Sequence, residues 1–179
     1  DGTIASGDLA DDAVTAAKIA DAVGLGKILQ VQSSIAQSRT TGSGTTYADA
    51  GFSDTITCSA TSSKVLVIAN FNFGVDNNNQ SVTSVSLKQR LLRSNDGFSS
   101  DSNQIYATTS FSNFPENSGM DFIIAGTTAM VTVDSPSSTS ELTYKVQVRS
   151  NSGDLWEVGT DLGDSEFGAR GFTLIEIGA

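Results

Sequence analysis

Alternation of apolar and polar residues is the feature that most constrains how this chain folds. It is clearest in residues 141–149 (ELTYKVQVR), where every second residue from Leu142 to Val148 is apolar and the residues between them are polar. Successive side chains of a β-strand point to opposite faces, so this pattern predicts a strand with one face buried and one face in water. Such half-wetted strands are typical of antiparallel sheets.

Similar segments, separated by turn residues, recur after residue 26. We predict further strands at residues 27–38, 55–60, 64–75, 82–93, 104–110, 121–134 and 171–177. The sixth of these segments is either two strands or one strand bent at Gly126. Eight or slightly more antiparallel strands in about 150 residues suit an all-β, two-sheet sandwich with a jelly-roll-like topology.

One predicted strand is apolar on both of its faces, at residues 65–68 (VLVI). A strand of this kind lies either at the centre of the sandwich or against another subunit. The chain also holds 26 Ser and 19 Thr. These residues favour strand surfaces and turns over helix interiors, which agrees with a β-rich fold.

The composition excludes several classes of chemical site. The chain has no His, which removes Ser-His-Asp and Cys-His mechanisms and histidine metal sites. The single cysteine, Cys58, forbids an internal disulfide, a thiolate zinc site and an iron–sulfur cluster. We expect Cys58 to be a small buried hydrophobe. We therefore expect no enzyme activity, no catalytic or metal residues and no cofactor.

Charge and hydropathy narrow the possible partners. The chain has 20 acidic and 10 basic side chains and a net charge of -10, which argues against nucleic acid as a partner. No apolar run approaches the roughly 20 residues that a membrane helix needs. We expect neither a nucleic-acid partner nor a membrane.

Residues 1–26 differ from the rest of the chain and repeat with a period of about ten residues. We predict two parts, an N-terminal stalk or attachment segment at residues 1–26 and a β-sandwich head at residues 27–179. Repeats of this kind bury apolar residues by association, so three copies around an axis would place five residues inside. These residues are Ile4, Leu9, Val14, Ile19 and Val23. The alternative is a flexible acidic leader.

Two acidic stretches bear on cation binding. Residues 76–79 (DNNN) resemble the start of an EF-hand loop, but Ser81 and Leu87 stand where Gly and Glu are needed. A turn is the favoured interpretation. Residues 154–166 carry five carboxylates between glycines. A solvated loop is favoured there over a cation site or a glycosidase carboxylate pair.

Aromatic and basic residues supply the candidate contact surfaces. Aromatic residues in or beside predicted loops would stack on sugars or contact proteins if exposed, whereas loops covering a sandwich end bury them equally well. They are Phe98, Tyr106, Phe111, Phe114 and Trp156. Lys88 and Arg90 share a strand face, which is either solvated or paired with acids of a neighbouring chain.

Several segments resemble bacteriophage proteins. Residues 8–23 (DLADDAVTAAKIADAV) resemble a short repeat common in tail-fibre and virion-appendage proteins. Three later segments resemble, in order, a C-terminal domain of such proteins, especially from marine phages. They are TCSATSSKVLVIANFNFG at 57–74, VDSPSSTSELTYKVQVRS at 133–150 and GFTLIEIGA at 171–179.

This resemblance implies a homotrimeric, jelly-roll-like β-sandwich on a stalk that joins it to the virion as a fibre, knob or head decoration. We expect a non-enzymatic structural protein on the virion surface. Residues 1–26 would attach it to other capsid or tail proteins, and the head would stabilise the particle or contact the host. The alternative is a carbohydrate-binding domain, receptor-binding or depolymerising, of a tail fibre.

Overall fold

The computed structural model describes residues 27–77, 84–113, 122–151, 153–159 and 168–178. These residues form ten strands and no helix. The strands are β1 (Lys27–Ala36), β2 (Thr40–Ser43), β3 (Ala48–Thr57), β4 (Lys64–Asn77), β5 (Ser84–Ser94), β6 (Asn103–Asn113), β7 (Phe122–Asp134), β8 (Glu141–Ser150), β9 (Leu155–Val158) and β10 (Arg170–Gly178).

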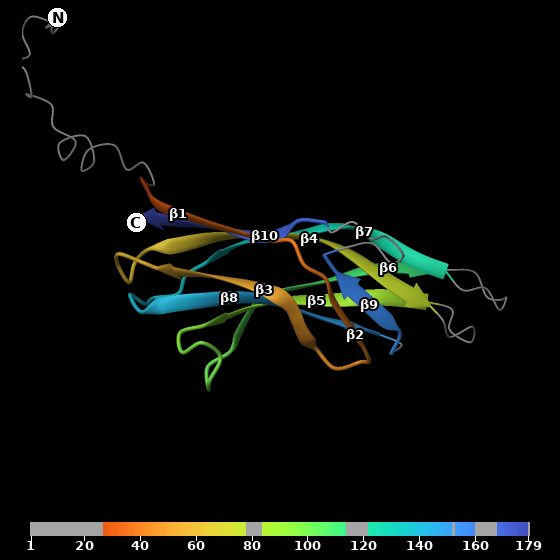
Figure 1. Cartoon of the computed structure of the whole chain (residues 1–179). Coiled ribbons are helices and arrows are strands. Elements are labelled where there is room, and N and C mark those ends of the chain that lie inside the picture. Colours follow the sequence, from red (N-terminus) through yellow and green to blue (C-terminus); the bar gives the residue numbers. More distant parts are fainter. Residues whose placement is uncertain (1–26, 78–83, 114–121, 152, 160–167, 179) are drawn as a thin grey trace, which may run out of the picture.

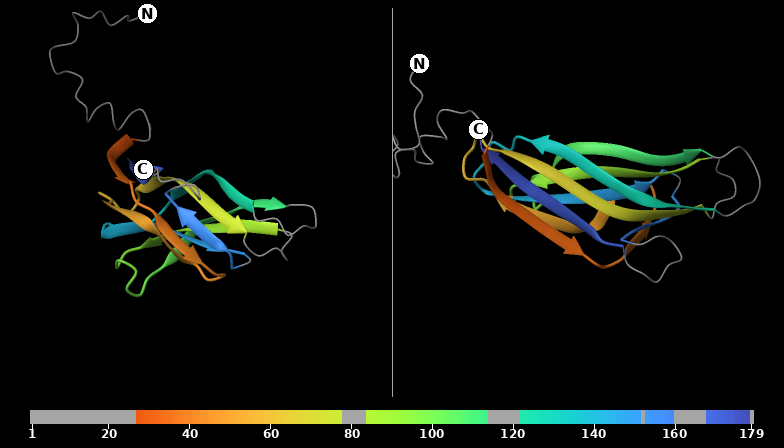
Figure 2. Two further views of the ribbon diagram at one scale, coloured as in Figure 1. Left: turned by 45° about the vertical axis from the view of Figure 1, so that its right-hand side comes forward. Right: turned by 90° about the horizontal axis from the view of Figure 1, so that it is seen from above.

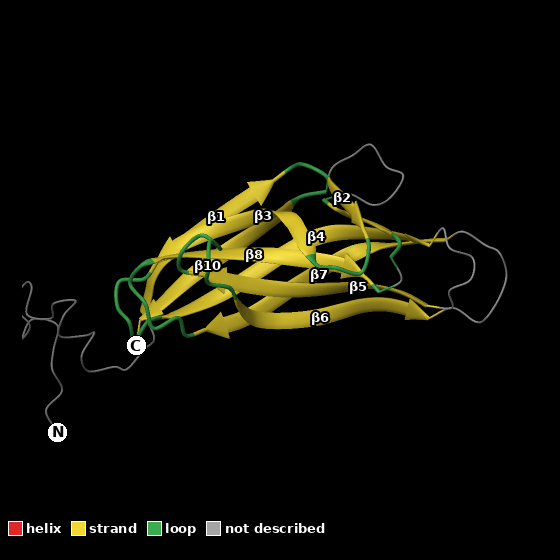
Figure 3. Cartoon of the chain, turned by 90° about the horizontal axis from the view of Figure 1, so that it is seen from below, coloured by secondary structure: helices red, strands yellow, loops and turns green. Residues whose placement is uncertain are grey.

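The strands build two antiparallel sheets that stack as layers (Figure 1). In sheet A the order is β1–β10–β4–β9–β2, and β7 pairs with the other side of β4. Seen from above, β1, β10, β4 and β7 lie side by side (Figure 2). Sheet B has the order β3–β8–β5–β6 and is seen from below in Figure 3. This arrangement confirms the predicted all-β, two-sheet sandwich with a jelly-roll-like topology.

The core lies between the two sheets, and strand alternation builds it. In β8 the four apolar residues from Leu142 to Val148 are buried, and the polar residues between them are half-buried, as predicted. In β4 every second residue from Val65 to Val75 is buried. The rings of Phe52, Phe71 and Phe172 meet at the centre, with centroids 5.2–5.5 Å apart in the two contacts that Phe52 makes.

Some predicted strand boundaries need correction. The strand predicted at residues 55–60 begins earlier, at Ala48, and the short strands β2 and β9 were not predicted. Gly51 interrupts β3 with a φ of 80° at a register shift, where a side chain would collide with Thr40. This bulge breaks the alternation that marks a strand. Residues 122–134 form one strand paired with β4 throughout.

A buried polar cluster joins the two sheets at one end of the core. Asp134 of β7, in sheet A, lies 2.8 Å from a guanidinium nitrogen of Arg93, in β5 of sheet B. The hydroxyl of Tyr144 in β8 also donates to Asp134, at 2.8 Å. Burial, and then the nearby Asp134 carboxylate, raise the pKa of Tyr144. The cluster therefore fixes how the sheets sit on each other.

Two further charged side chains of β10 are buried and were not predicted. Arg170 donates to the carbonyl of Ala50 at 2.6 Å, and burial lowers its pKa. The carboxylate of Glu176 accepts hydrogen bonds from Gln30, Ser59 and Ser63. Burial alone would raise the pKa of Glu176, but these hydrogen bonds outweigh it and lower the pKa to about 2.

The other local predictions have mixed outcomes. Cys58 is 2% exposed, and burial raises the pKa of its thiol, which confirms the prediction of a small buried residue. Asp76 and Asn77 lie in β4, so the strand runs into the predicted turn. Residues 78 and 79 of that turn are outside the described residues.

Candidate functional site

The outer side of sheet A carries apolar side chains in rows that run across its strands. Ile175 of β10 stands between Val31 of β1 and Leu66 of β4. Leu66 also stands opposite Val133 of β7. Residues directly opposite each other in neighbouring strands share one face of a sheet. These four residues therefore form a continuous apolar row over four strands.

Neighbouring positions extend this row into a surface that we call the apolar face. Ile68 pairs with Val131 beside the first row, and Ile28 pairs with Ile177 on its other side. The apolar face consists of Ile28, Val31, Ile35, Leu66, Ile68, Val131, Val133, Ile175 and Ile177.

The apolar face is open to solvent in the single chain. Ile35 is 72% exposed and Ile28 is 63% exposed, and the three valines are each more than half exposed. These five residues alone present on the order of 500 Å² of apolar surface, near the upper end of the roughly 300–600 Å² of the largest patch on a typical monomer. Patches of this size mark interaction sites more often than single exposed residues do.

The apolar face is also free of acids. Of the carboxylates in the four strands, Asp134 and Glu176 are buried on the inner side, and Asp76 lies at the far end of β4. Lys64 borders the face, opposite Ile177. In a chain of net charge -10, this is a surface that a second copy can approach with little charge repulsion.

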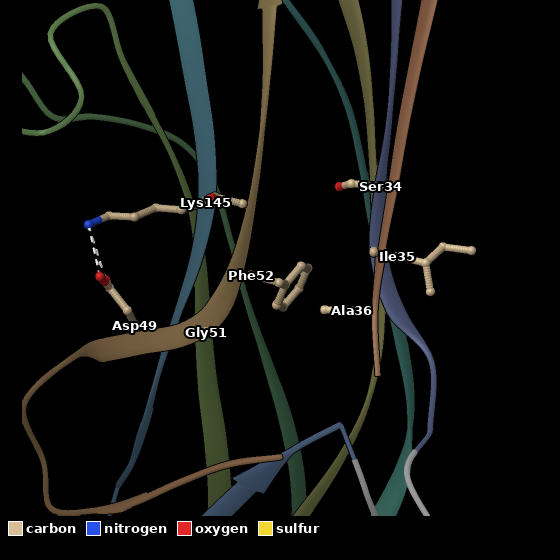
Figure 4. Close-up of a pocket in the computed structure, with 9 residues that line it drawn as sticks. Ser34, Ile35, Ala36, Asp49, Gly51, Phe52 and Lys145 are labelled. Atoms are coloured by element: carbon tan, nitrogen blue, oxygen red, sulfur yellow. Dashed lines mark hydrogen bonds and ion pairs between the residues drawn. The ribbon is translucent and has the colours of Figure 1, made fainter. Parts of the chain in front are cut away.

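A pocket of 410 Å³ lies between the edges of the two sheets, where β1 passes β3. Ser34 and Ala36 line it from β1, and the ring of Phe52 extends toward them from β3 (Figure 4). The only charged residues lining it are Asp49 and Lys145, and they pair with each other at 3.1 Å. Figure 4 also shows the Ile35 side chain pointing away from Phe52, toward the outer side of sheet A.

The predicted contact aromatics do not form one surface. Phe98 is half-buried in the loop after β5, with the Lys145 ammonium 4.0 Å from its ring centroid. Tyr106 is partly buried and packs against the core. Phe111 lies in β6, but its side chain is not among the described ones, and Phe114 lies outside the described residues.

Trp156 corrects an expectation, because it is a core residue and not an exposed one. It is 1% exposed and stands between Gly42 of β2 and Val75 of β4. Gly42 leaves the room that the indole occupies, since a side chain at this position would collide with it. Trp156 therefore offers no surface contact in the single chain.

The predicted stalk residues Ile4, Leu9, Val14, Ile19 and Val23 lie outside the described residues. Within the acidic stretch, Asp154 and Glu157 are buried, and Glu157 pairs with Arg39 at 3.5 Å. The other three carboxylates of the acidic stretch lie outside the described residues. In the part of the chain that is described, no group of three metal-ligating side chains is found, and no helix has the length and hydropathy to cross a membrane.

No protein-family model matches this chain, and no curated protein matches it in sequence. The resemblance to phage appendage proteins therefore stays a prediction. The chain is similar in structure to Eiger TNF from S. frugiperda, at 13% identity and a TM-score of 0.34, over 64% of this chain and 59% of that chain.

It is also similar to infectious bursal disease virus structures. The Gt strain structure is 14% identical with a TM-score of 0.36, and the match covers 84% of this chain and 38% of that chain. The VP2 subviral particle is 12% identical with a TM-score of 0.31, over 84% and 42%. The chain thus spans less than two thirds of these proteins. The likeness to a viral β-sandwich is coarse, and at such TM-scores it carries no argument about function.

Proposed function

We propose that this chain is a non-enzymatic structural protein of a virion, a homotrimer whose copies meet through the apolar face of sheet A. Residues 1–26 attach it to other virion proteins, and the rest of the sandwich faces outward, where it stabilises the particle or contacts a host. The observation that carries the proposal is the acid-free apolar face across β1, β10, β4 and β7.

The size of this face fits an association surface. At about 25 cal/mol per Å², removing on the order of 500 Å² from water gains roughly 12 kcal/mol. Association itself costs roughly 4–15 kcal/mol in lost freedom of motion. The exposed part of the face thus about balances that cost. The half-buried apolar residues around it, such as Leu66 and Ile68, supply the surplus.

The ends of the described chain support the same arrangement. Lys27, where β1 begins, pairs with Gly178, where β10 ends, directly beside the pair Ile28 and Ile177. Residues 1–26 therefore join the sandwich at the border of the apolar face. Copies that meet through this face hold their N-terminal segments near one another, as a shared stalk requires.

The proposed location on a virion is supported by resemblances in the amino-acid sequence. The leader repeat and the three strand motifs resemble those of phage appendage proteins, in the same order along the chain. The absence of His from the whole sequence fits a chain that works by assembly and contact.

Sedimentation velocity of matched variants tests the proposal. Val133→Lys places a charge in the apolar face at a residue that is 54% exposed, so the fold tolerates it. We expect the complex to dissociate into monomers. Thr55→Lys, at an exposed position of β3 in sheet B, is the control and leaves the complex intact. Equal sedimentation of both variants and the parent protein would show that the apolar face is not the interface.

A further inference from the structure

The outer side of sheet B carries a different set of side chains, which we call the basic face. Lys88 of β5 stands directly opposite Arg149 of β8, and Arg90 of β5 stands opposite Gln147. The strands that carry them lie inside the sheet, between β3 and β6 (Figure 3). The basic face consists of Tyr47, Lys88, Arg90, Phe98, Lys145 and Arg149.

Aromatic rings accompany the cations on this face. The guanidinium carbon of Arg90 lies 4.2 Å from the ring centroid of Tyr47, and that of Arg149 lies 5.2 Å from it. The Lys145 ammonium lies 4.0 Å from the Phe98 centroid. Cations over ring faces are held in place by attraction to the ring electrons. Three of the four cations of the basic face, Arg90, Lys145 and Arg149, are therefore positioned and not merely solvated.

The charge balance of this face is opposite to that of the chain. It holds four of the 10 basic residues of a chain with 20 acidic ones. Asp49 pairs with Lys145 at 3.1 Å. Within the described residues, no ion pair joins an acid to Lys88, Arg90 or Arg149. Like charges directly opposite each other in a sheet are destabilising, so the pair of Lys88 and Arg149 costs stability until an anion lies between them.

We propose that the basic face binds an acidic polysaccharide, a linear chain of sugars that carry carboxylates. A carboxylate between Lys88 and Arg149 relieves their repulsion, and the ring of Tyr47 holds the Arg90 and Arg149 guanidinium groups in position to contact the sugar chain. Lys145 and Arg149 lie four residues apart on β8, about 13 Å at strand spacing, so the basic face is long enough for several sugar units.

Other anionic partners fit this face less well. β5 and β8 are paired on both sides, so they offer no free backbone edge on which an acidic peptide could add a strand. Single-stranded nucleic acids are bound through exposed rings on which bases stack, whereas the Tyr47 ring already lies under two guanidinium groups. Cations spaced along β5 and β8 suit a sugar chain that carries carboxylates.

Binding of polygalacturonate, measured by biolayer interferometry against neutral dextran, tests the proposal. We expect the full chain to bind polygalacturonate and not dextran. Lys88→Gln and Arg149→Gln should each weaken binding about tenfold, the loss of one charge-assisted contact. Lys64→Gln, at an exposed strand position in sheet A, is the matched control and should leave binding unchanged. Absence of binding, or equal loss in all three variants, would overturn the proposal.

Two further arms separate sugar recognition from charge alone. Polyglutamate and single-stranded DNA carry anions without the sugar carboxylates, and we expect both to bind at least tenfold more weakly than polygalacturonate. Tyr47→Leu should weaken polygalacturonate binding by a similar factor while thermal unfolding shows an intact fold. Equal affinity for polyglutamate, or full binding by Tyr47→Leu, would refute polysaccharide recognition. Val133→Lys keeps the basic face, so this result is independent of the oligomeric state.

Discussion

The two outer faces of this sandwich are built on the same kind of strand and differ in what they expose. On sheet A, outward positions such as Val31 and Val133 are aliphatic and more than half exposed. On sheet B, outward positions such as Lys88 and Arg149 are charged and half-buried, and Arg149 lies over the ring of Tyr47. The inner faces of both sheets are mostly apolar, apart from buried polar residues such as Asp134 and Glu176. Burial in the core does not constrain the residue types at outer positions. The residue types found there therefore indicate what each face contacts.

In our two proposals, one face contacts copies of the chain and the other binds a soluble anion. An apolar face gains from burial against another apolar surface, and a basic face gains from a charged partner that stays hydrated. The two uses do not compete, because the faces lie on opposite sides of a single core (Figure 1).

We expect the largest loss of stability when the buried cluster that joins the two sheets is broken, because both faces depend on the sandwich. Asp134→Ala leaves Arg93 and Tyr144 without their shared buried acceptor. We expect the free energy of unfolding to fall by about 3 kcal/mol in chemical denaturation. Asp49→Ala removes an exposed ion pair of Lys145 and should cost about 0.5 kcal/mol. Equal losses would show that the buried cluster does not hold the sheets together.

A second test changes Glu176, which is buried on the inner side of sheet A, beneath the apolar face. The pKa of Glu176 is lowered from 4.5 to about 2. A carboxyl with a lowered folded pKa stabilises the fold above its unfolded pKa, and this stability is lost as pH falls from about 4.5 to about 2. Glu176→Gln should be less stable at neutral pH by about 1–3 kcal/mol and should lose less on acidification. Parallel stability curves for the two proteins would contradict this role.

Salt should affect binding at the basic face and leave self-association through the apolar face unchanged. Raising the NaCl concentration from about 0.05 M to about 0.5 M shortens the screening length severalfold. We expect polygalacturonate binding to weaken at least tenfold, and the sedimentation of the complex to stay unchanged, because apolar burial is not screened. Dissociation of the complex by salt would assign the self-contact to charge.

Among the residues of the two faces, we expect the smallest effect at the edge of the basic face. Lys145→Gln removes the cation over Phe98 and the pair with Asp49, both at the surface. We expect a loss of stability of about 0.5–1 kcal/mol in thermal unfolding. A loss as large as that of Asp134→Ala would contradict this, because it would show that Lys145 stabilises the fold as much as the buried cluster that joins the two sheets.

The sequence predicts the long strands well, because alternation is imposed by burial on one side. β8 and β4 follow it closely, and the run at residues 65–68, apolar on both faces, lies in β4, which is paired on both sides within sheet A. The bulge at Gly51 and the four-residue strands β2 and β9 were missed, since they are too short or irregular to show a period.

The contact surfaces were harder to predict than the fold. The apolar face comes from four strands that are distant in the chain, so only their pairing shows it. Trp156 was a candidate surface-contact residue with burial as the alternative, and Gly42, more than 100 residues earlier, makes room for it in the core. Lys88 and Arg90 were placed correctly on one strand face, whereas the partners Tyr47 and Arg149 come from other strands.

Sedimentation equilibrium of the full chain gives the mass in solution without assumptions about shape, so it decides whether the chain is a trimer. We expect a species of three chains that persists at micromolar concentrations and becomes a single chain in Val133→Lys. A parent protein that stays at 18.6 kDa at all concentrations would contradict it.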